Sequence, residues 1–122
     1  MTIYTTQTLV DDVTYGTASG NYDGSSQDWY SNAVPAANYY GGQGALQTIT
    51  YRLQDFVGVI TIEAALNDSQ ESAPWFTVAT YSDGSTVETG TIPVNVLGNF
   101  TWLRAQITEF QSGTIQAITA AY

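Results

Sequence analysis

Carboxylates are the side chains that could carry acid–base or metal chemistry here, because the sequence contains no His and no Cys. Histidine is the commonest general base and metal ligand, and thiolates are the usual zinc ligands. The close carboxylate pairs are Asp11 with Asp12, Asp68 with Glu71, and Asp83 with Glu88. Each falls in an expected turn or on an exposed strand face, where water keeps both groups ionised, whereas glycoside hydrolysis needs one carboxyl held neutral. We therefore expect a protein that is not an enzyme and uses no cofactor.

The polar loop 21–28 is the one place where metal binding is worth weighing. It supplies two carboxylates, Asp23 and Asp28, with Gly24 to permit a sharp turn. A calcium loop brings roughly six to eight oxygens to one point. The spacing here is not that of an EF-hand, and no Glu follows at the required offset. Asp23 and Asp28 are kept as weak calcium candidates, while an ordinary polar turn is the favoured interpretation.

Arg104 is one of two basic residues in the chain, the other being Arg52. In a regular strand Trp102, Arg104 and Gln106 face the same way. A guanidinium beside a Trp can stack over an aromatic ring, or it can pair with a carboxylate such as Glu63 on a neighbouring strand. We favour such a structural contact, with recognition of a ligand or a subunit as the alternative.

Aromatic residues are the remaining functional signal, with three Trp and nine Tyr among 122 residues. Aromatic side chains can bind sugar faces, anchor protein interfaces or fill a core. For the adjacent pair Trp75 and Phe76, we expect Phe76 to point inward, because Val78 continues its face. The candidates for an interface or ligand-binding surface are Trp29, Tyr30, Tyr39, Tyr40, Trp75, Trp102 and Arg104.

Charge and composition exclude several classes of partner. Eleven carboxylates against two basic side chains give a net charge of -9, and charged residues make up only 11% of the chain. Nucleic-acid binding rests on several Lys or Arg contacts to phosphates, so we expect no nucleic-acid partner. No apolar stretch approaches the roughly 20 residues of a membrane helix, and the first six residues lack the basic and apolar pattern of a secretory signal, so we expect no membrane partner.

The elements that must position these residues are strands. Ile60, Ile62 and Ala64 alternate with polar neighbours, as in a half-buried strand, and no 3.6-residue period is sustained anywhere. The pair Asp83-Gly84 is typical of a tight hairpin and is expected to join strands 75–81 and 86–89. The expected strands are 1–13, 28–31, 46–53, 57–66, 75–81, 86–89, 91–96, 100–108 and 114–122.

Residues 15–44 interrupt this regularity. The segment is rich in Gly, Ser and aromatic residues and poor in aliphatic ones, so we expect a long arm or loop that is ordered by contact with a neighbour. The chain is large enough for one core. The sequence therefore predicts a single all-β domain, 1–122, with a strand and arm over 1–44 and an antiparallel, jelly-roll-like β-sandwich over 45–122.

The order of strands over 57–122 resembles the jelly-roll module of discoidin-like and galactose-binding-like domains. In that module a strand such as Gly58–Ala64 leads through a polar loop to a Trp-containing strand, here 74–78. A later strand that combines aromatic, aliphatic and Arg residues follows, here 100–105. The resemblance covers about half of the chain.

A second resemblance concerns the whole chain. Its length, its lack of Cys and His, its surface rich in Thr, Ser, Gly and Tyr, and the motif Gly98–Ala105 look like small virion proteins of T4-like tailed phages, particularly marine ones. The resemblance implies a non-enzymatic structural component of the virion that packs against copies of itself and other virion proteins in a capsid, neck or tail. The alternative is a carbohydrate-binding module for host-surface recognition, with Trp75 or Trp102 beside Asn67, Asp68 and Arg104.

Overall fold

The computed structural model describes residues 6–37, 46–66, 75–82 and 84–122, and in these ranges the chain is built from strands. The strands are β1 (Thr6–Thr14), β2 (Trp29–Tyr30), β3 (Val34–Pro35), β4 (Leu46–Ala65), β5 (Phe76–Tyr81), β6 (Glu88–Leu97) and β7 (Trp102–Ala121). Every pairing between them is antiparallel. The prediction of an all-β, antiparallel, sandwich-like fold is confirmed. No helix in the described ranges has the length and apolar character needed to span a membrane.

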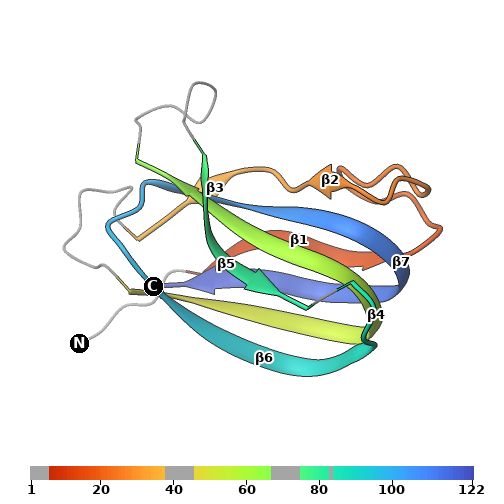
Figure 1. Ribbon diagram of the computed structural model, residues 1–122. Coiled ribbons are helices and arrows are strands. Elements are labelled where there is room, and N and C mark those ends of the chain that lie inside the picture. Colours follow the sequence, from red (N-terminus) through yellow and green to blue (C-terminus); the bar gives the residue numbers. More distant parts are fainter. Residues whose placement is uncertain (1–5, 38–45, 67–74, 83) are drawn as a thin grey trace.

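Two 20-residue strands, β4 and β7, form the centre of the sheet and pair with one another along their length. The sheet order is β1-β7-β4-β5, with β6 also on β4 and with β2 and β3 also on β7. Figure 1 shows that β4 and β7 run to one end of the molecule, bend there and return. One sheet is thereby folded back on itself into two layers.

Each layer uses one half of β4 and one half of β7. In the first layer, the first half of β4 lies between β6 and the second half of β7, and β1 pairs with that half of β7. In the second layer, the second half of β4 lies between β5 and the first half of β7, which also pairs with β2 and β3.

The bend depends on residues with left-handed backbone conformations. Asp55 and Glu109 each have a φ of 53°, and Gly113 has a φ of 88°. The β4–β7 register shifts in this region, between Gln54 and Val57 and again between Val57 and Val59. An extra residue in one strand bends that strand without ending its pairing. The sequence-based breaks at 54–56 and 109–113 are therefore wrong as strand ends, because both strands continue through the bend.

The core lies between the two layers. Alternate residues of β4 and β7 are fully buried, and Phe56 packs near Phe110 at the bend with ring centroids 5.6 Å apart. Tyr51 of the first layer stacks on Tyr81 of the second at 4.8 Å. Burying aliphatic and aromatic side chains stabilises such a core by about 1.5–3 kcal/mol for each one. The largest fully buried aliphatic residues are Ile49, Leu53, Ile60, Ile62, Leu103, Ile107, Ile115 and Ile118.

The expected hairpin between 75–81 and 86–89 is also wrong. Strands β5 and β6 both pair with β4, at its second and first halves respectively. The connection between them therefore passes from the second layer to the first, instead of reversing within one layer. Asp83 of the expected turn lies outside the described residues. The two short strands expected at 86–89 and 91–96 are one strand, β6, which includes Gly90 with a φ of 137°.

The segment 15–37 packs on its own chain, which corrects the expectation of an arm ordered by a neighbour. Tyr22 and Trp29 are buried in a cluster around Phe110, with ring centroids 5.1 and 6.4 Å from it. The backbone N–H of Ser31 donates to the carbonyl of Ala105 at 2.8 Å. The segment has few aliphatic side chains, so buried aromatic rings and backbone pairing with β7 hold it in place instead. Residues 38–44, including Tyr39 and Tyr40, lie outside the described residues.

Candidate functional site

The outer face of the second layer gathers polar and aromatic side chains from several strands. Glu63 of β4 pairs in register with Arg104 of β7, and Thr61 pairs with Gln106. Tyr30 of β2 lies opposite Gln106 on the other side of β7. Directly paired residues project to the same side of a sheet. The intervening residues of β7 point inward and are fully buried: Leu103, Ala105 and Ile107.

The Arg104 guanidinium lies between two aromatic rings. Its central carbon is 4.3 Å from the ring centroid of Tyr30 and 4.4 Å from that of Trp75, within cation–π range of both. Its Nε donates to Oε1 of Glu63 at 2.7 Å. The predicted ion pair with Glu63 is confirmed, and so is stacking on aromatic rings. The two rings come from β2 and from the residue before β5. We call Tyr30, Glu63, Trp75, Arg104 and Gln106 the Arg104 face.

The chemistry available to the Arg104 face is hydrogen-bond donation. A guanidinium offers five N–H donors and no acceptor. Within the described part of the chain, only its Nε has a hydrogen-bond partner, which leaves the N–H groups of the two terminal nitrogens without one. About a quarter of the Arg104 side chain is exposed, 24%, against 14% for Glu63. The Gln106 Nε2 donates to the Tyr30 hydroxyl at 3.2 Å, which helps to hold that ring in place.

The structure brings three of the seven sequence-based candidates together: Tyr30, Trp75 and Arg104. Two other candidates, Trp29 and Trp102, are buried, with exposed fractions of 7% and 9%. Trp29 is buried because β2 places it against the aromatic cluster at the bend, where it packs near Phe110. Tyr39 and Tyr40, like Asn67 and Asp68 of the carbohydrate alternative, lie outside the described residues.

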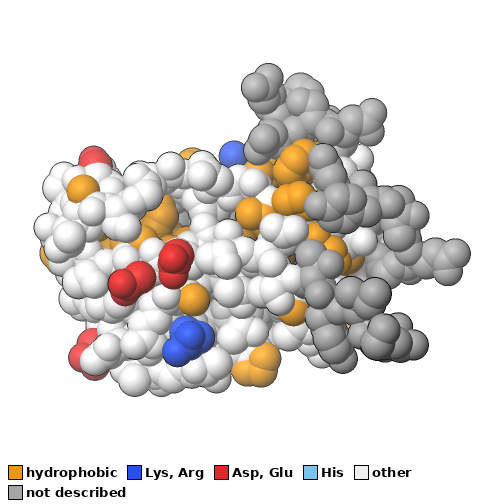
Figure 2. Space-filling view, turned by 180° about the vertical axis from the view of Figure 1, so that it is seen from behind, with side chains coloured by type: hydrophobic (Ala, Val, Ile, Leu, Met, Phe, Trp, Pro, Cys, Tyr) orange, Lys and Arg blue, Asp and Glu red, His pale blue; other side chains and the backbone are white. Residues whose placement is uncertain are grey.

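A second surface feature, which sequence reasoning missed, is apolar. Because β4 bends back, its first and last residues lie at the same end of the sandwich (Figure 1). Exposed large side chains gather there, among them Leu97 at 75% and Leu66 at 59% exposed. Figure 2 shows hydrophobic side chains at this end, beside the grey segments. We call this surface the open end; it consists of Leu46, Leu66, Phe76 and Leu97.

Phe76 illustrates how the open end arises. It pairs with the buried Ala64, which places it on the inner face as the sequence predicted, and its ring meets that of Phe100 edge-to-face at 5.8 Å. It nevertheless remains 38% exposed. Leu46 pairs with Leu97 in the first layer. The Leu46–Leu97 pair adjoins the buried pair Gln47–Val96, which places both leucines on the outer face of the first layer. The available signal in the sequence was that Leu66 and Leu97 stand directly before the turn formers Asn67 and Gly98.

The weak calcium candidates serve as hydrogen-bond acceptors within the chain. The Asp23 Oδ1 accepts the backbone N–H groups of Ser25 and Ser26 at 2.9 and 2.7 Å, and its Oδ2 accepts the Ser26 hydroxyl at 2.6 Å. The Ser26 hydroxyl, followed by these backbone donors, lowers the pKa of Asp23 to about 2. Asp28 accepts the N–H of Glu109 at 3.2 Å. No group of three potential metal ligands occurs among the described side chains, so Asp23 is best understood as the cap of a polar turn.

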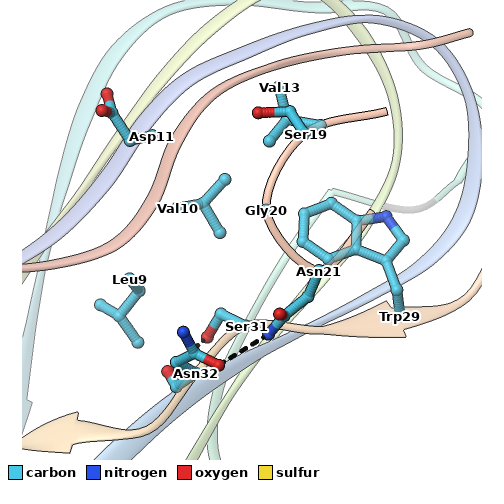
Figure 3. Close-up of a pocket in the computed structure, with 10 residues that line it drawn as sticks. All are labelled: Leu9, Val10, Asp11, Val13, Ser19, Gly20, Asn21, Trp29, Ser31 and Asn32. Carbon is cyan, nitrogen blue, oxygen red and sulfur yellow. Dashed lines mark hydrogen bonds between the residues drawn. The ribbon is translucent and has the colours of Figure 1, made fainter. Parts of the chain in front are cut away.

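A small hollow lies between β1, the turn around Gly20 and the segment after β2 (Figure 3). Its volume is about 140 Å³, which is below the roughly 300 Å³ at which ligand pockets usually begin. Leu9, Val10 and Val13 form its apolar side. At its edge the Asn21 amide donates to Asn32 Oδ1 at 2.9 Å and so is already engaged within the chain. The hollow is a weaker candidate than the Arg104 face.

Comparison of the chain with known protein families, with curated proteins and with solved structures gave no match. The functional assignment therefore rests on the open end, the Arg104 face and the resemblances noted in the sequence.

Proposed function

We propose that this chain is a non-enzymatic structural component of a phage virion that acts by packing against copies of itself and other virion proteins in a capsid, neck or tail. The observation that carries the packing function is the open end. Four large apolar side chains are exposed at one end of a small domain that has a well-filled core elsewhere. The assignment to a virion rests on the resemblance of the sequence to small phage structural proteins.

Burial of the open end supplies the energy for association. Leu97 and Leu66 would each contribute up to about 1.5–3 kcal/mol on full burial against a partner. Several large apolar side chains exposed at one end of a domain mark an interaction site more often than single surface leucines do. A few such anchors at the centre of a contact carry most of the binding energy in typical interfaces.

Strand β5, which begins at the open end, adds a second route to packing. Within the described residues it pairs with β4 alone, so its other edge faces outward. Its sequence, Phe76–Tyr81, contains no charged residue and no Pro. Natural edge strands are usually protected by Lys, Pro or other charges, and this chain contains no Lys at all. An unprotected edge suits a protein that works in contact with neighbours.

The packing function is tested by size-exclusion chromatography with light scattering on the purified chain at micromolar concentrations. Dimers or larger assemblies are expected, and their fraction should rise with concentration. A monomer at every concentration would count against packing between copies.

Detection of peptides from this chain in purified phage particles, at many copies for each particle, tests the location separately. Its absence from particles would contradict the virion assignment while leaving self-association standing.

A carbohydrate-binding module is the second candidate, and the Arg104 face is the observation that favours it. The face combines two aromatic rings with guanidinium, carboxylate and amide groups on one side of a sheet. Such a combination of ring surface and hydrogen-bonding groups suits a sugar. A glycan array is the direct test, and binding that is unaffected by loss of Trp75 or Arg104 would contradict this candidate.

A further inference from the structure

We propose that the Arg104 face binds the carboxylate of an acidic sugar, such as a uronic acid. This inference goes beyond the packing function and rests on a different surface, and it gives the carbohydrate-binding alternative a definite class of ligand. It starts from the donors that the fold leaves unused. Within the described residues, Arg104 pairs through Nε with Glu63 and makes no other hydrogen bond.

The two stacked rings determine how a ligand can approach. The guanidinium carbon lies over the rings of Tyr30 and Trp75, at 4.3 and 4.4 Å from their centroids, so both rings restrict access to the group. Glu63 occupies the Nε edge. The donors left for a ligand are on the terminal nitrogens, whose N–H groups form a planar fork. That geometry matches the two coplanar oxygens of a carboxylate.

The side chain is also held in position before any ligand arrives. Two ring contacts and one ion pair fix the Arg104 side chain, so little further rotamer entropy is lost on binding. Glu63 balances the charge of Arg104 locally, which keeps the expected affinity modest. The other carboxylates of this acidic chain are weakened by salt beyond about 8–10 Å. We therefore expect a dissociation constant in roughly the millimolar range.

The position of Arg104 favours a sugar over an extended peptide. Arg104 lies on β7, which is already paired with β4 on one side and with β2 and β3 on the other. A peptide cannot add there as a further strand, so it would lack the backbone hydrogen bonds of that binding mode. A sugar ring can instead lie against the sheet face, where Tyr30 is 43% exposed and Thr61 and Gln106 project to the same side.

Two-dimensional NMR of the whole chain tests the proposal, with sodium glucuronate as the probe. The Nε–H signal of Arg104 and the indole signal of Trp75 should shift and saturate with glucuronate. Glucose, the matched neutral sugar, should cause no shift at these signals. Acetate, the matched carboxylate without a sugar, should bind about fivefold or more weakly. No saturable shift at Arg104 with glucuronate, or equal shifts with glucose, would overturn the proposal. Equal affinity for acetate or for a short Glu-containing peptide would overturn the choice of a sugar.

Variants separate this site from the rest of the surface. Arg104→Lys keeps the charge but loses the planar fork, and should weaken glucuronate binding at least about tenfold. Arg52→Lys, the matched change at the other Arg, should leave binding unchanged. Tyr30→Ala, which leaves the Glu63 pair intact, should also weaken binding and carries the test if Arg104→Lys fails to fold. Wild-type affinity in both Arg104→Lys and Tyr30→Ala would overturn the proposal, and neither result depends on whether the chain self-associates.

Discussion

At the scale of single residues, Tyr51 includes a group that lowers the stability of the core. Its side chain is fully buried, and its hydroxyl has no hydrogen-bond partner among the described residues. Its stacking partner Tyr81 instead donates to Glu88 at 2.9 Å. A buried polar group without a partner costs free energy, so the ring of Tyr51 stabilises the core while its hydroxyl opposes folding.

The change Tyr51→Phe is therefore predicted to stabilise the protein. It keeps the ring stack and removes the unpaired hydroxyl, so the free energy of unfolding at pH 7 should rise by about 1 kcal/mol. Denaturant unfolding followed by circular dichroism measures the change. Tyr22→Phe is the control, because the Tyr22 hydroxyl accepts the N–H of Gly16 at 3.0 Å and its loss should destabilise. A loss of stability in Tyr51→Phe would show that the hydroxyl does have a partner.

The same tyrosine gives a prediction for pH. Burial, with a smaller contribution from nearby Tyr81, raises the pKa of Tyr51 well above its ordinary value. The folded state therefore holds this proton more tightly than the unfolded state. The stability that Tyr51 contributes in its protonated form is complete below about pH 10 and is lost progressively as the pH rises above that value. Unfolding curves from pH 8 to 11 should fall less steeply in Tyr51→Phe than in the wild type, and parallel curves would contradict the assignment.

The residue scale also shows how much of the site the sequence contained. Alternation along 100–106 set Arg104 on one face with Trp102 and Gln106, and cross-strand pairing suggested Glu63 as its partner, an ion pair that the structure confirms. The rings over the guanidinium could not be deduced, because Tyr30 and Trp75 reach it only through the register of β2 and β5. The burial of Trp29 could not be deduced either, because it depends on where the segment 15–37 folds back onto the bend.

At the scale of elements, the fold depends on bends within strands. Apolar alternation predicted most strand segments, because it reports which face is buried. It could not distinguish a turn that ends a strand from a bulge that bends it, since both use the same residues: Gly, Asp and Asn. The expected strands therefore stopped at 53 and 108, and 111–113 was interpreted as a turn, although β4 and β7 remain paired around the bend. The two-layer arrangement follows from this bend.

Gly113→Ala should be among the most damaging single changes in the chain. Gly113 has a φ of 88°, and an added Cβ would overlap the backbone of Asp55 at the bend. The expected loss is about 3 kcal/mol or more in the free energy of unfolding. Gly16→Ala is the matched control, since Gly16 has a φ of 91° and open space around the same position; its loss should be about 1 kcal/mol. Equal losses in thermal or denaturant unfolding would show that close packing at the bend is unimportant.

At the scale of the whole molecule, attraction at the open end competes with charge repulsion. The chain carries a net charge of -9, so copies repel one another at low ionic strength. Salt screens this repulsion and leaves the burial of apolar surface intact. Raising sodium chloride from about 20 to about 500 mM should therefore strengthen self-association, as measured by sedimentation velocity. Dissociation on adding salt would mean that ion pairs, rather than the open end, hold the copies together.

The most direct test of the central claim compares two single substitutions to Lys in sedimentation equilibrium. Leu97 lies at the open end and is 75% exposed, while Val87 is 60% exposed and precedes β6 at the opposite, bent end. Both changes add one positive charge at an exposed apolar position. The account predicts that Leu97→Lys weakens association about tenfold or more and that Val87→Lys leaves it near the wild-type value. Equal association of all three proteins, or a wild type that stays monomeric, would contradict the claim that this chain acts by packing through its open end.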